Sequence, residues 1–172
     1  MQTFLPYSDF HRSAKVLDRQ RLGKQRVEVL QIYKALSSGG GWSNHPATLM
    51  WKGYDYALLE YGLVICQEWR RRGYNDSLLP RFERELESLY PTGYPEWLGI
   101  ELLHDSHKAH LYHKDPAYYL MFASYSTRIL LWPKTIMTTS GMEVKCLVPS
   151  DPLRMDLNPP SVTQRSPDPT LH

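Results

Sequence analysis

The sequence has no long apolar run and only two cysteines, and each of these absences excludes a class of protein. No stretch approaches the ~20 apolar residues of a membrane-spanning helix, and the first residues lack the basic-then-apolar order of a secretory signal. Cys66 and Cys146 are too few for a disulfide scaffold or a thiolate zinc site, and too far apart for a redox pair. We therefore expect two free thiols in a cytoplasmic protein that does not bind membranes.

The chain also lacks the motifs of the large enzyme classes, such as a Gly-rich phosphate loop, a nucleophile elbow, an HExxH helix or a zinc-finger spacing. What it has is an ordinary globular composition over 172 residues, with 42% hydrophobic and 22% charged residues. This composition excludes a wholly disordered or collagen-like chain, and the length suits one domain.

Apolar residues recur at steps of three and four through the first 122 residues, which predicts an all-α fold, a compact single-domain helical bundle. The longest run of this pattern begins at Asn44-His45-Pro46 and ends at Gly73, so it predicts one long central helix. The expected helices span residues 9–17, 18–36, 46–72, 78–89, 102–113 and 116–122.

The last 50 residues differ in composition, because they hold seven of the thirteen prolines. Residues 127–131 and 143–148 could form short strands, but residues 149–172 show almost no periodic apolar pattern. We therefore divide the chain into a helical domain, residues 1–133, and an irregular, partly disordered Pro-rich tail, residues 134–172.

Charge is unevenly distributed along a chain whose formal net charge is only +2. Residues 1–36 carry seven Lys and Arg against three Asp and Glu, whereas residues 53–103 carry nine Asp and Glu. A basic segment on a nearly neutral protein favours an anionic partner, nucleic acid first, although a solvated charged helix gives the same pattern.

Arg21, Lys24 and Glu28 lie on one face of the expected helix 18–36. Such a spacing can be a surface ladder of ion pairs, worth about 0.3–0.5 kcal/mol each. The functional alternative is a single carboxylate within a cationic, phosphate-binding surface. Because a carboxylate repels DNA, its presence there indicates acid–base or cation-stabilising catalysis.

Four histidines recur at every third residue of the expected helix 102–113, and Asp105 follows the first of them. Steps of three residues rotate by about 60° around a helix, so at most two neighbours could share a metal ion. His45, His104 and Asp105 leave a metal phosphohydrolase as one alternative. Contacts of His107 and Lys108 with phosphates or bases, or plain surface histidines, are the other interpretations.

An ordered set of short motifs extends from the start of the chain to about Trp132-Pro133. The motifs are Leu17-Asp18, Arg21-Leu22, Gln25-Arg26-Val27-Glu28, Asn44-His45-Pro46, Arg71-Arg72-Gly73-Tyr74, His104-Asp105-Ser106-His107-Lys108 and Lys114-Asp115-Pro116 with Tyr119. Taken together and in order, they resemble the pyrimidine-dimer DNA glycosylase family, the endonuclease V-like enzymes, in its bacterial branch.

The resemblance implies a metal-free, cofactor-free helical enzyme that acts on double-stranded DNA containing damaged or modified pyrimidines. We expect it to be monomeric and associated with the nucleoid through DNA. In the family mechanism the α-amine of the chain attacks C1′ of the damaged nucleotide, a helical glutamate stabilises the cationic sugar, and a Schiff base then undergoes β-elimination. Glu28 matches that glutamate. The expected DNA contacts are Arg21, Lys24, Arg26, Asn44, His45, His107 and Lys108.

A terminal amine suits this chemistry because its pKa of ~7.7–8.0 leaves much of it neutral near pH ~7.5, whereas an ordinary lysine, at ~10.4, is almost wholly protonated. Gln2 is bulky, so we expect Met1 to be retained and its amine to be the nucleophile. Removal of Met1 would instead expose Gln2, whose amine can cyclise. The sequence also departs from the family by placing Val27 directly before the glutamate, where the family has Arg.

Two further interpretations stay open. The same scaffold could excise a modified base other than a pyrimidine dimer, and a non-catalytic DNA-binding module could retain the basic face.

Overall fold

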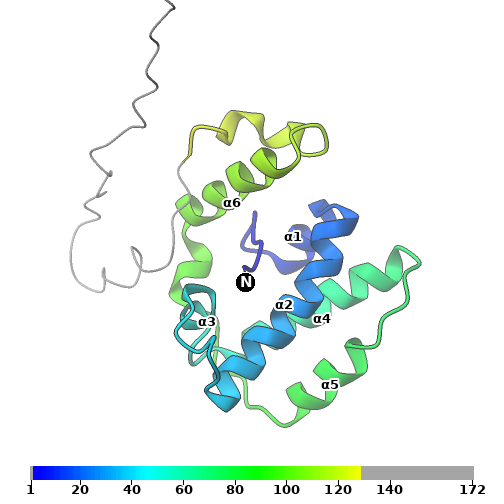
Figure 1. Ribbon diagram of the computed structural model, residues 1–172, viewed down its shortest axis with the longest axis vertical. Coiled ribbons are helices and arrows are strands. Elements are labelled where there is room, and N and C mark those ends of the chain that lie inside the picture. The colour runs from blue at the N-terminus through cyan, green and yellow to red at the C-terminus, as the bar shows by residue number, and fades with distance from the viewer. Residues whose placement is uncertain (1, 129–172) are drawn as a thin grey trace, which may run out of the picture. The chain divides into compact units, whose positions relative to one another are not determined.

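The structure is a computed structural model of the chain that describes residues 2–128, and these residues form helices joined by turns and loops, with no strand among them (Figure 1). The α-helices are α1 (Phe10–Val16), α2 (Arg19–Ser38), α3 (Pro46–Met50), α4 (Asp55–Arg71), α5 (Leu79–Glu87) and α6 (Glu101–Lys114), and the 3-10 helices are η1 (Glu96–Gly99) and η2 (Leu120–Tyr125). The predicted all-α class is confirmed. No helix in this part of the chain is long and apolar enough to cross a membrane.

Several predictions fall outside the described residues. The predicted tail 134–172, the strand 143–148 and all but the first two residues of the strand 127–131 lie there. Met1 and Cys146 lie there as well. Cys66 is a free, buried thiol in α4, and burial raises its pKa.

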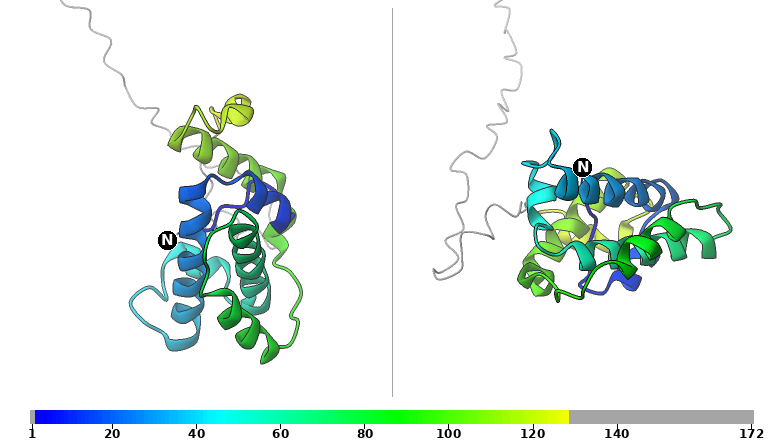
Figure 2. Two further views of the ribbon diagram at one scale, coloured as in Figure 1. Left: turned by 90° about the vertical axis from the view of Figure 1, so that its right-hand side faces the viewer. Right: turned by 90° about the horizontal axis from the view of Figure 1, so that it is seen from below.

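Helix α2 packs against α4, and α4 also carries α1 and α5 (Figure 1, Figure 2). These helices approach closely at Gly62 in α4, where an added Cβ would lie 2.8 Å from Val29 Cγ1 and 3.0 Å from the Phe82 ring. The start of α2 is fixed by Asp18, whose carboxylate caps the helix, and its end by Gly39, which adopts the left-handed conformation at φ 66°.

The long central helix is present as α4, but it begins at Asp55 rather than at residue 46 as the pattern predicted. A separate short helix, α3, ends at Met50, and Gly53 turns the chain at φ 83°. The break lets Trp51 point into the core, where its indole N–H donates to Thr3 Oγ1 at 3.2 Å. Tertiary packing of one tryptophan therefore overrides the helical periodicity.

Helix α6 follows η1, whose Trp97 and Leu98 are buried. The helix expected over residues 116–122 is instead a turn followed by η2. Asp115 fixes that turn by accepting a hydrogen bond from the Tyr118 amide at 3.1 Å. Together, α6 and η2 bring two elements from late in the chain against its first residues.

Candidate active site

The first described residues run through the interior as an extended segment, in which Thr3, Phe4 and Leu5 are buried. Buried backbone groups outside a sheet need side-chain partners. Gln25 of α2 provides two of them, since its Oε1 accepts from the Phe4 amide at 2.9 Å and its Nε2 donates to the Gln2 carbonyl at 3.0 Å. The hydroxyl of Tyr61 donates to the Phe4 carbonyl at 3.0 Å.

Two histidines of α6 hold the next residue, Leu5. The Leu5 amide donates to Nδ1 of His107 at 2.8 Å, and the Leu5 carbonyl lies 2.7 Å from Nδ1 of His104. The other ring nitrogen of His104 lies 2.6 Å from the Leu98 carbonyl. Because the Leu5 amide donates to it, Nδ1 of His107 carries no proton, and burial lowers the pKa of this ring to about 3. The two histidines therefore provide Leu5 with the hydrogen-bond partners that a neighbouring strand would provide in a sheet.

Glu28 lies where this segment begins. Its side chain is 8% exposed, its Oε2 accepts a hydrogen bond from the Gln2 amide at 3.1 Å, and its Oε1 lies 3.7 Å from Lys24 Nζ. The chain therefore holds a buried carboxylate against its own N-terminal segment. Lys24 is 70% exposed, so its ammonium is open to solvent while it faces the carboxylate.

A cavity of about 270 Å³ opens beside Glu28, and we call it the Glu28 cavity. Three cationic side chains surround the single carboxylate, which is the arrangement expected of an anion-binding site that also does chemistry. Its lining residues are Gln2, Phe4, Gln20, Arg21, Lys24, Gln25, Glu28 and Lys114. The predicted grouping of Arg21, Lys24 and Glu28 on one face of α2 is thus present in the structure.

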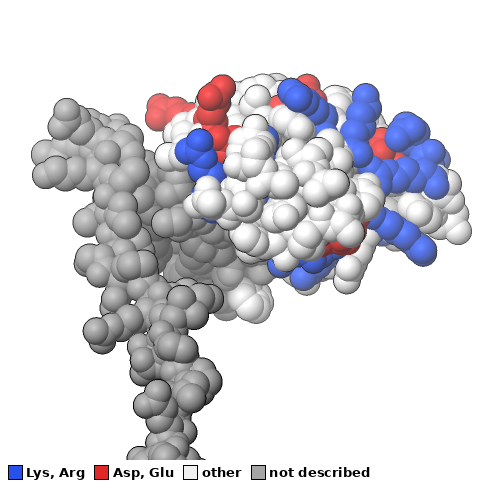
Figure 3. Space-filling model, turned by 90° about the horizontal axis from the view of Figure 1, so that it is seen from above, with Lys and Arg blue, Asp and Glu red and all other residues white. Residues whose placement is uncertain are grey.

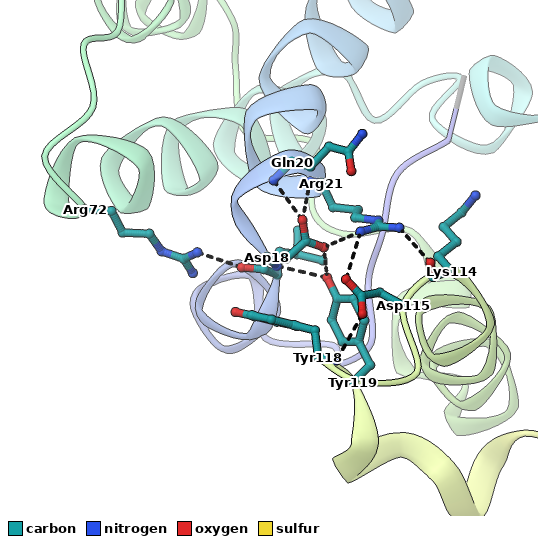
Figure 4. Close-up of polar contacts among 9 residues, drawn as sticks. Asp18, Gln20, Arg21, Arg72, Lys114, Asp115, Tyr118 and Tyr119 are labelled. Atoms are coloured by element: carbon teal, nitrogen blue, oxygen red, sulfur yellow. Dashed lines mark hydrogen bonds and ion pairs between the residues drawn. The ribbon is translucent and has the colours of Figure 1, made fainter.

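Arg21 is held in place by groups from the start of α2 and the end of α6 (Figure 4). Its guanidinium donates to Asp18 Oδ2 at 3.1 Å and to the Lys114 carbonyl at 3.1 Å, and it lies 3.8 Å from Asp115 Oδ2. Tyr119 donates a hydrogen bond to the same Asp18 carboxylate. This network ties the start of α2 to the end of α6, and so brings Lys114 to the cavity.

Arg26 points to a different set of partners. It makes an ion pair at 3.0 Å with Asp76 Oδ1, whose side chain is fully buried, and its guanidinium lies 4.6 Å from the centre of the Trp69 ring. It is not among the residues that line the Glu28 cavity. The structure therefore separates the two arginines that the sequence placed together as phosphate contacts.

The remaining expected contacts are also dispersed. His107 is 4% exposed, and Lys108 pairs with Asp105 at 2.8 Å in a separate pocket with Tyr7 and Tyr125. Asn44 is exposed before α3. His45 caps α3 by accepting a hydrogen bond from the Ala47 amide. Burial lowers the pKa of its ring, although the negative charge of Glu28 acts to raise it. That electrostatic influence puts His45 in the neighbourhood of Glu28.

Sequence reasoning gave no role to Gln25 or Lys114, although both stand in the motifs. For Gln25 there was a signal, because it shares the buried side of α2 with Leu22 and Val29 and is a polar residue there. Lys114 had none, since only the folding of α6 onto α2 brings it to the cavity. Among residues 2–128, no three His, Cys, Asp or Glu side chains are arranged to hold a metal ion.

Residues 1–79 match the family model described as pyrimidine dimer DNA glycosylase. This part of the chain is therefore similar to the pyrimidine dimer DNA glycosylase family. The match includes Gln2, Arg21, Lys24, Gln25 and Glu28, so every lining residue of the Glu28 cavity except Lys114 lies within the matched residues. No curated protein and no solved structure matches the chain significantly. The resemblance of residues 80–133 stays a prediction.

Proposed function

We propose that the protein is a DNA glycosylase with associated abasic-site lyase activity, acting on pyrimidine dimers in duplex DNA. The observation that carries this proposal is the buried Glu28 carboxylate, which accepts a hydrogen bond from the Gln2 amide within a cation-lined cavity. The family match of residues 1–79 gives the substrate class. The cavity supports the proposed chemistry, because it joins a carboxylate to cationic side chains that attract phosphates.

The nucleophile in this proposal is the α-amine of residue 1. Three covalent bonds separate that amine from the Gln2 amide nitrogen, so chain geometry keeps it within about 4 Å of that atom. The Gln2 nitrogen is itself 3.1 Å from Glu28 Oε2. The anchoring of the Gln2 amide at Glu28 therefore supports the proposal that the amine one residue before it reacts beside this carboxylate.

The reaction then follows in balanced steps. The neutral amine attacks C1′ with its lone pair, the glycosidic C–N bond breaks, and its electron pair leaves with the base, which takes up a proton. Glu28 stabilises the positive charge on the sugar and accepts the proton that the attacking nitrogen must lose. Opening of the sugar ring gives a protonated Schiff base. Loss of a 2′ proton then expels the 3′ phosphate by β-elimination.

Two positions of the cavity are suited to the flanking phosphates. Lys24 is 70% exposed beside the carboxylate, and Lys114, which also lines the cavity, is exposed at the end of α6. Arg21 is 16% exposed and held by Asp18, so we propose that it fixes the wall and presents charge rather than moving to meet DNA. Extrusion of the damaged nucleotide toward this cavity costs a few kcal/mol, least where damage has weakened pairing.

The test is borohydride trapping on a duplex with one cyclobutane thymine dimer, in EDTA, with the cross-linked peptide read by mass spectrometry. We compare the native protein with Glu28→Gln, which keeps an acceptor for the Gln2 amide, and with Lys24→Gln, which removes a rival amine from the same cavity. We expect a cross-link at residue 1 in the native protein and in Lys24→Gln. In Glu28→Gln we expect cleavage to slow by on the order of 10²–10⁴-fold.

Other outcomes overturn specific parts of the proposal. A cross-link at Lys24 or Lys114 would move the nucleophile from the terminus to a side chain. Base release without a cross-link would mean that water is the nucleophile. An intact strand, with dimer DNA still bound, would leave a different modified base or a non-catalytic DNA-binding module.

A further inference from the structure

We propose that a second DNA-contacting surface extends from the Glu28 cavity across the start of α2 to the end of α4. We call it the α2–α4 basic surface and define it by Lys15, Arg19, Arg70 and Arg71. This inference rests on the proposed function for its ligand, the phosphate backbone of duplex DNA. None of these four residues is part of the Glu28 cavity.

Arg72 holds together the helix ends that carry this surface. Its guanidinium donates to the carbonyls of Ala14, Lys15 and Leu17 at 3.2, 2.9 and 2.7 Å, and its Nε donates to Glu68 at 2.7 Å. Figure 4 shows it reaching from α4 to the connection before α2. With every guanidinium nitrogen engaged, Arg72 is a structural clamp that joins the end of α4 to the end of α1.

Arg71, the preceding residue, is placed differently. It binds Glu68 at 2.7 and 2.8 Å, yet its side chain is 65% exposed. Glu68 is 6% exposed and already compensated by Arg72, so the pair presents a cation to solvent and buries the anion. Of these two neighbouring arginines, only Arg71 has its charge available to a partner.

Arg19, at the first turn of α2, is also exposed, and its guanidinium lies 4.9 Å from the centre of the Tyr74 ring. A flat guanidinium supported by an aromatic face keeps its outer N–H groups free to bind phosphate. Lys15 and Arg70 are exposed on the flanking helix ends. Figure 3 shows Lys and Arg gathered at one end of the molecule, which corresponds to the start of α2 and the end of α4 in Figure 1.

A pocket connects the two surfaces. Its lining includes Arg19, Gln20 and Arg21, and the last two also line the Glu28 cavity. Arg19 precedes Glu28 by nine residues on one helix, which is about 14 Å at 1.5 Å per residue. One DNA strand rises about 3.4 Å per nucleotide, so Arg19 would meet phosphates about four nucleotides from the lesion.

The experiment measures the salt dependence of binding to a duplex that carries one stable abasic-site analogue, which the enzyme cannot cleave. Arg19→Ala and Arg71→Ala are compared with the native protein and with Arg84→Ala, a control that removes an exposed arginine among the glutamates of α5. We expect the slope of log K against log salt to fall by about one unit for each of the first two variants. We expect no change for Arg84→Ala.

Two further measurements sharpen the test. Single-turnover excision of dimer DNA at low salt and saturating enzyme reports whether each variant keeps a working Glu28 cavity, which neither residue lines. Trimming the duplex to fewer than about four base pairs on one side of the lesion should remove the difference between native and variant protein on that side only.

Unchanged slopes in protein that still cuts dimer DNA would overturn this inference alone. Reduced slopes in a protein that cannot cut dimer DNA would support the surface and overturn the proposed function. Denaturation curves that match the native protein confirm that each variant is folded when its slope is read.

Discussion

The Tyr119 hydroxyl donates a hydrogen bond to the Asp18 carboxylate and accepts one from the Asp18 amide at 2.9 Å, so two residues 101 positions apart are joined twice. Burial raises the pKa of Asp18, but the hydrogen bonds from Tyr119 and from the start of α2 outweigh it and leave the pKa lowered. The capping carboxylate of α2 is thus kept charged by a residue near the end of the described chain.

Replacement of Tyr119 by Phe removes both of these hydrogen bonds and keeps the aromatic ring. The buried amide of Asp18 then lacks its partner, so we expect the free energy of unfolding to fall by about 1–3 kcal/mol. Urea denaturation measures this. Tyr118→Phe is the matched control, because no hydrogen bond from its exposed hydroxyl is present among the described residues. Equal stability of the two variants would contradict a structural role for the network.

His107 predicts acid-sensitive stability. Its folded pKa of about 3 is below the unfolded value of ~6.5, so the unfolded chain binds more protons between these values. Its contribution is complete above pH ~6.5 and is lost, at up to about 1.4 kcal/mol per pH unit, as the pH falls toward 3. His110, with a pKa lowered to about 4, adds to the same trend.

The variant His107→Asn tests this, because an amide oxygen can still accept from the Leu5 amide but does not titrate. We expect a flatter curve of stability against pH between 6.5 and 4 than in the native protein, measured by denaturation at each pH. His113→Asn, at an exposed position of the same helix, is the control. A native-like slope in His107→Asn would assign the effect to other groups.

Replacement of Gln25 should lower the rate of the chemical step without weakening DNA binding. This side chain holds the Gln2 carbonyl and the Phe4 amide, so Gln25→Leu should release the segment that carries the proposed nucleophile. We expect the single-turnover rate to fall by on the order of 10²-fold, since small misplacements of a reacting group are costly. Binding to uncleavable DNA should stay within about threefold, because the cations of the cavity remain. A parallel loss of binding would instead indicate general disruption.

Gly62 lies where α2, α4 and α5 pack closely, so a larger residue there should lower the stability of the fold. Gly62→Ala places a methyl group 2.8 Å from Val29 Cγ1 and 3.0 Å from Phe82, and overpacking of this kind costs about 1–3 kcal/mol. Gly40→Ala is the matched control, because nothing lies within 4 Å of its added Cβ. We therefore expect thermal denaturation to show a lower melting temperature for Gly62→Ala and an unchanged one for Gly40→Ala.

Local signals predicted much of this architecture. The start and end of α2 within two residues, and the grouping of Arg21, Lys24 and Glu28 on one face of it, follow from spacing and turn chemistry. The break before α4 was not predictable in this way, because a single glycine such as Gly53 within an apolar periodicity is compatible with a continuous helix. The burial of Trp51 and its hydrogen bond to Thr3 depend on a residue 48 positions away, so the neighbouring sequence does not predict them.

The site was predictable only where one helix carries it. Glu28 and Lys24 are one turn apart, so helical geometry brings them together before any tertiary contact forms. Arg26 lies on the same helix, but its buried partner Asp76 comes from the connection between α4 and α5. The anchoring of Leu5 by His104 and His107 depends on residues about 100 positions away, beyond the reach of sequence patterns.

That anchoring also determines when the site can form during synthesis. Leu5 leaves the ribosome before His107, which follows 102 positions later. A nascent chain that ends before α6 therefore has Glu28 and its helix but no partner for the Leu5 backbone. Contacts of such long sequence separation close late in folding. The backbone of Leu5, and with it the segment that brings the Gln2 amide to Glu28, is thus anchored only after α6 has been synthesised.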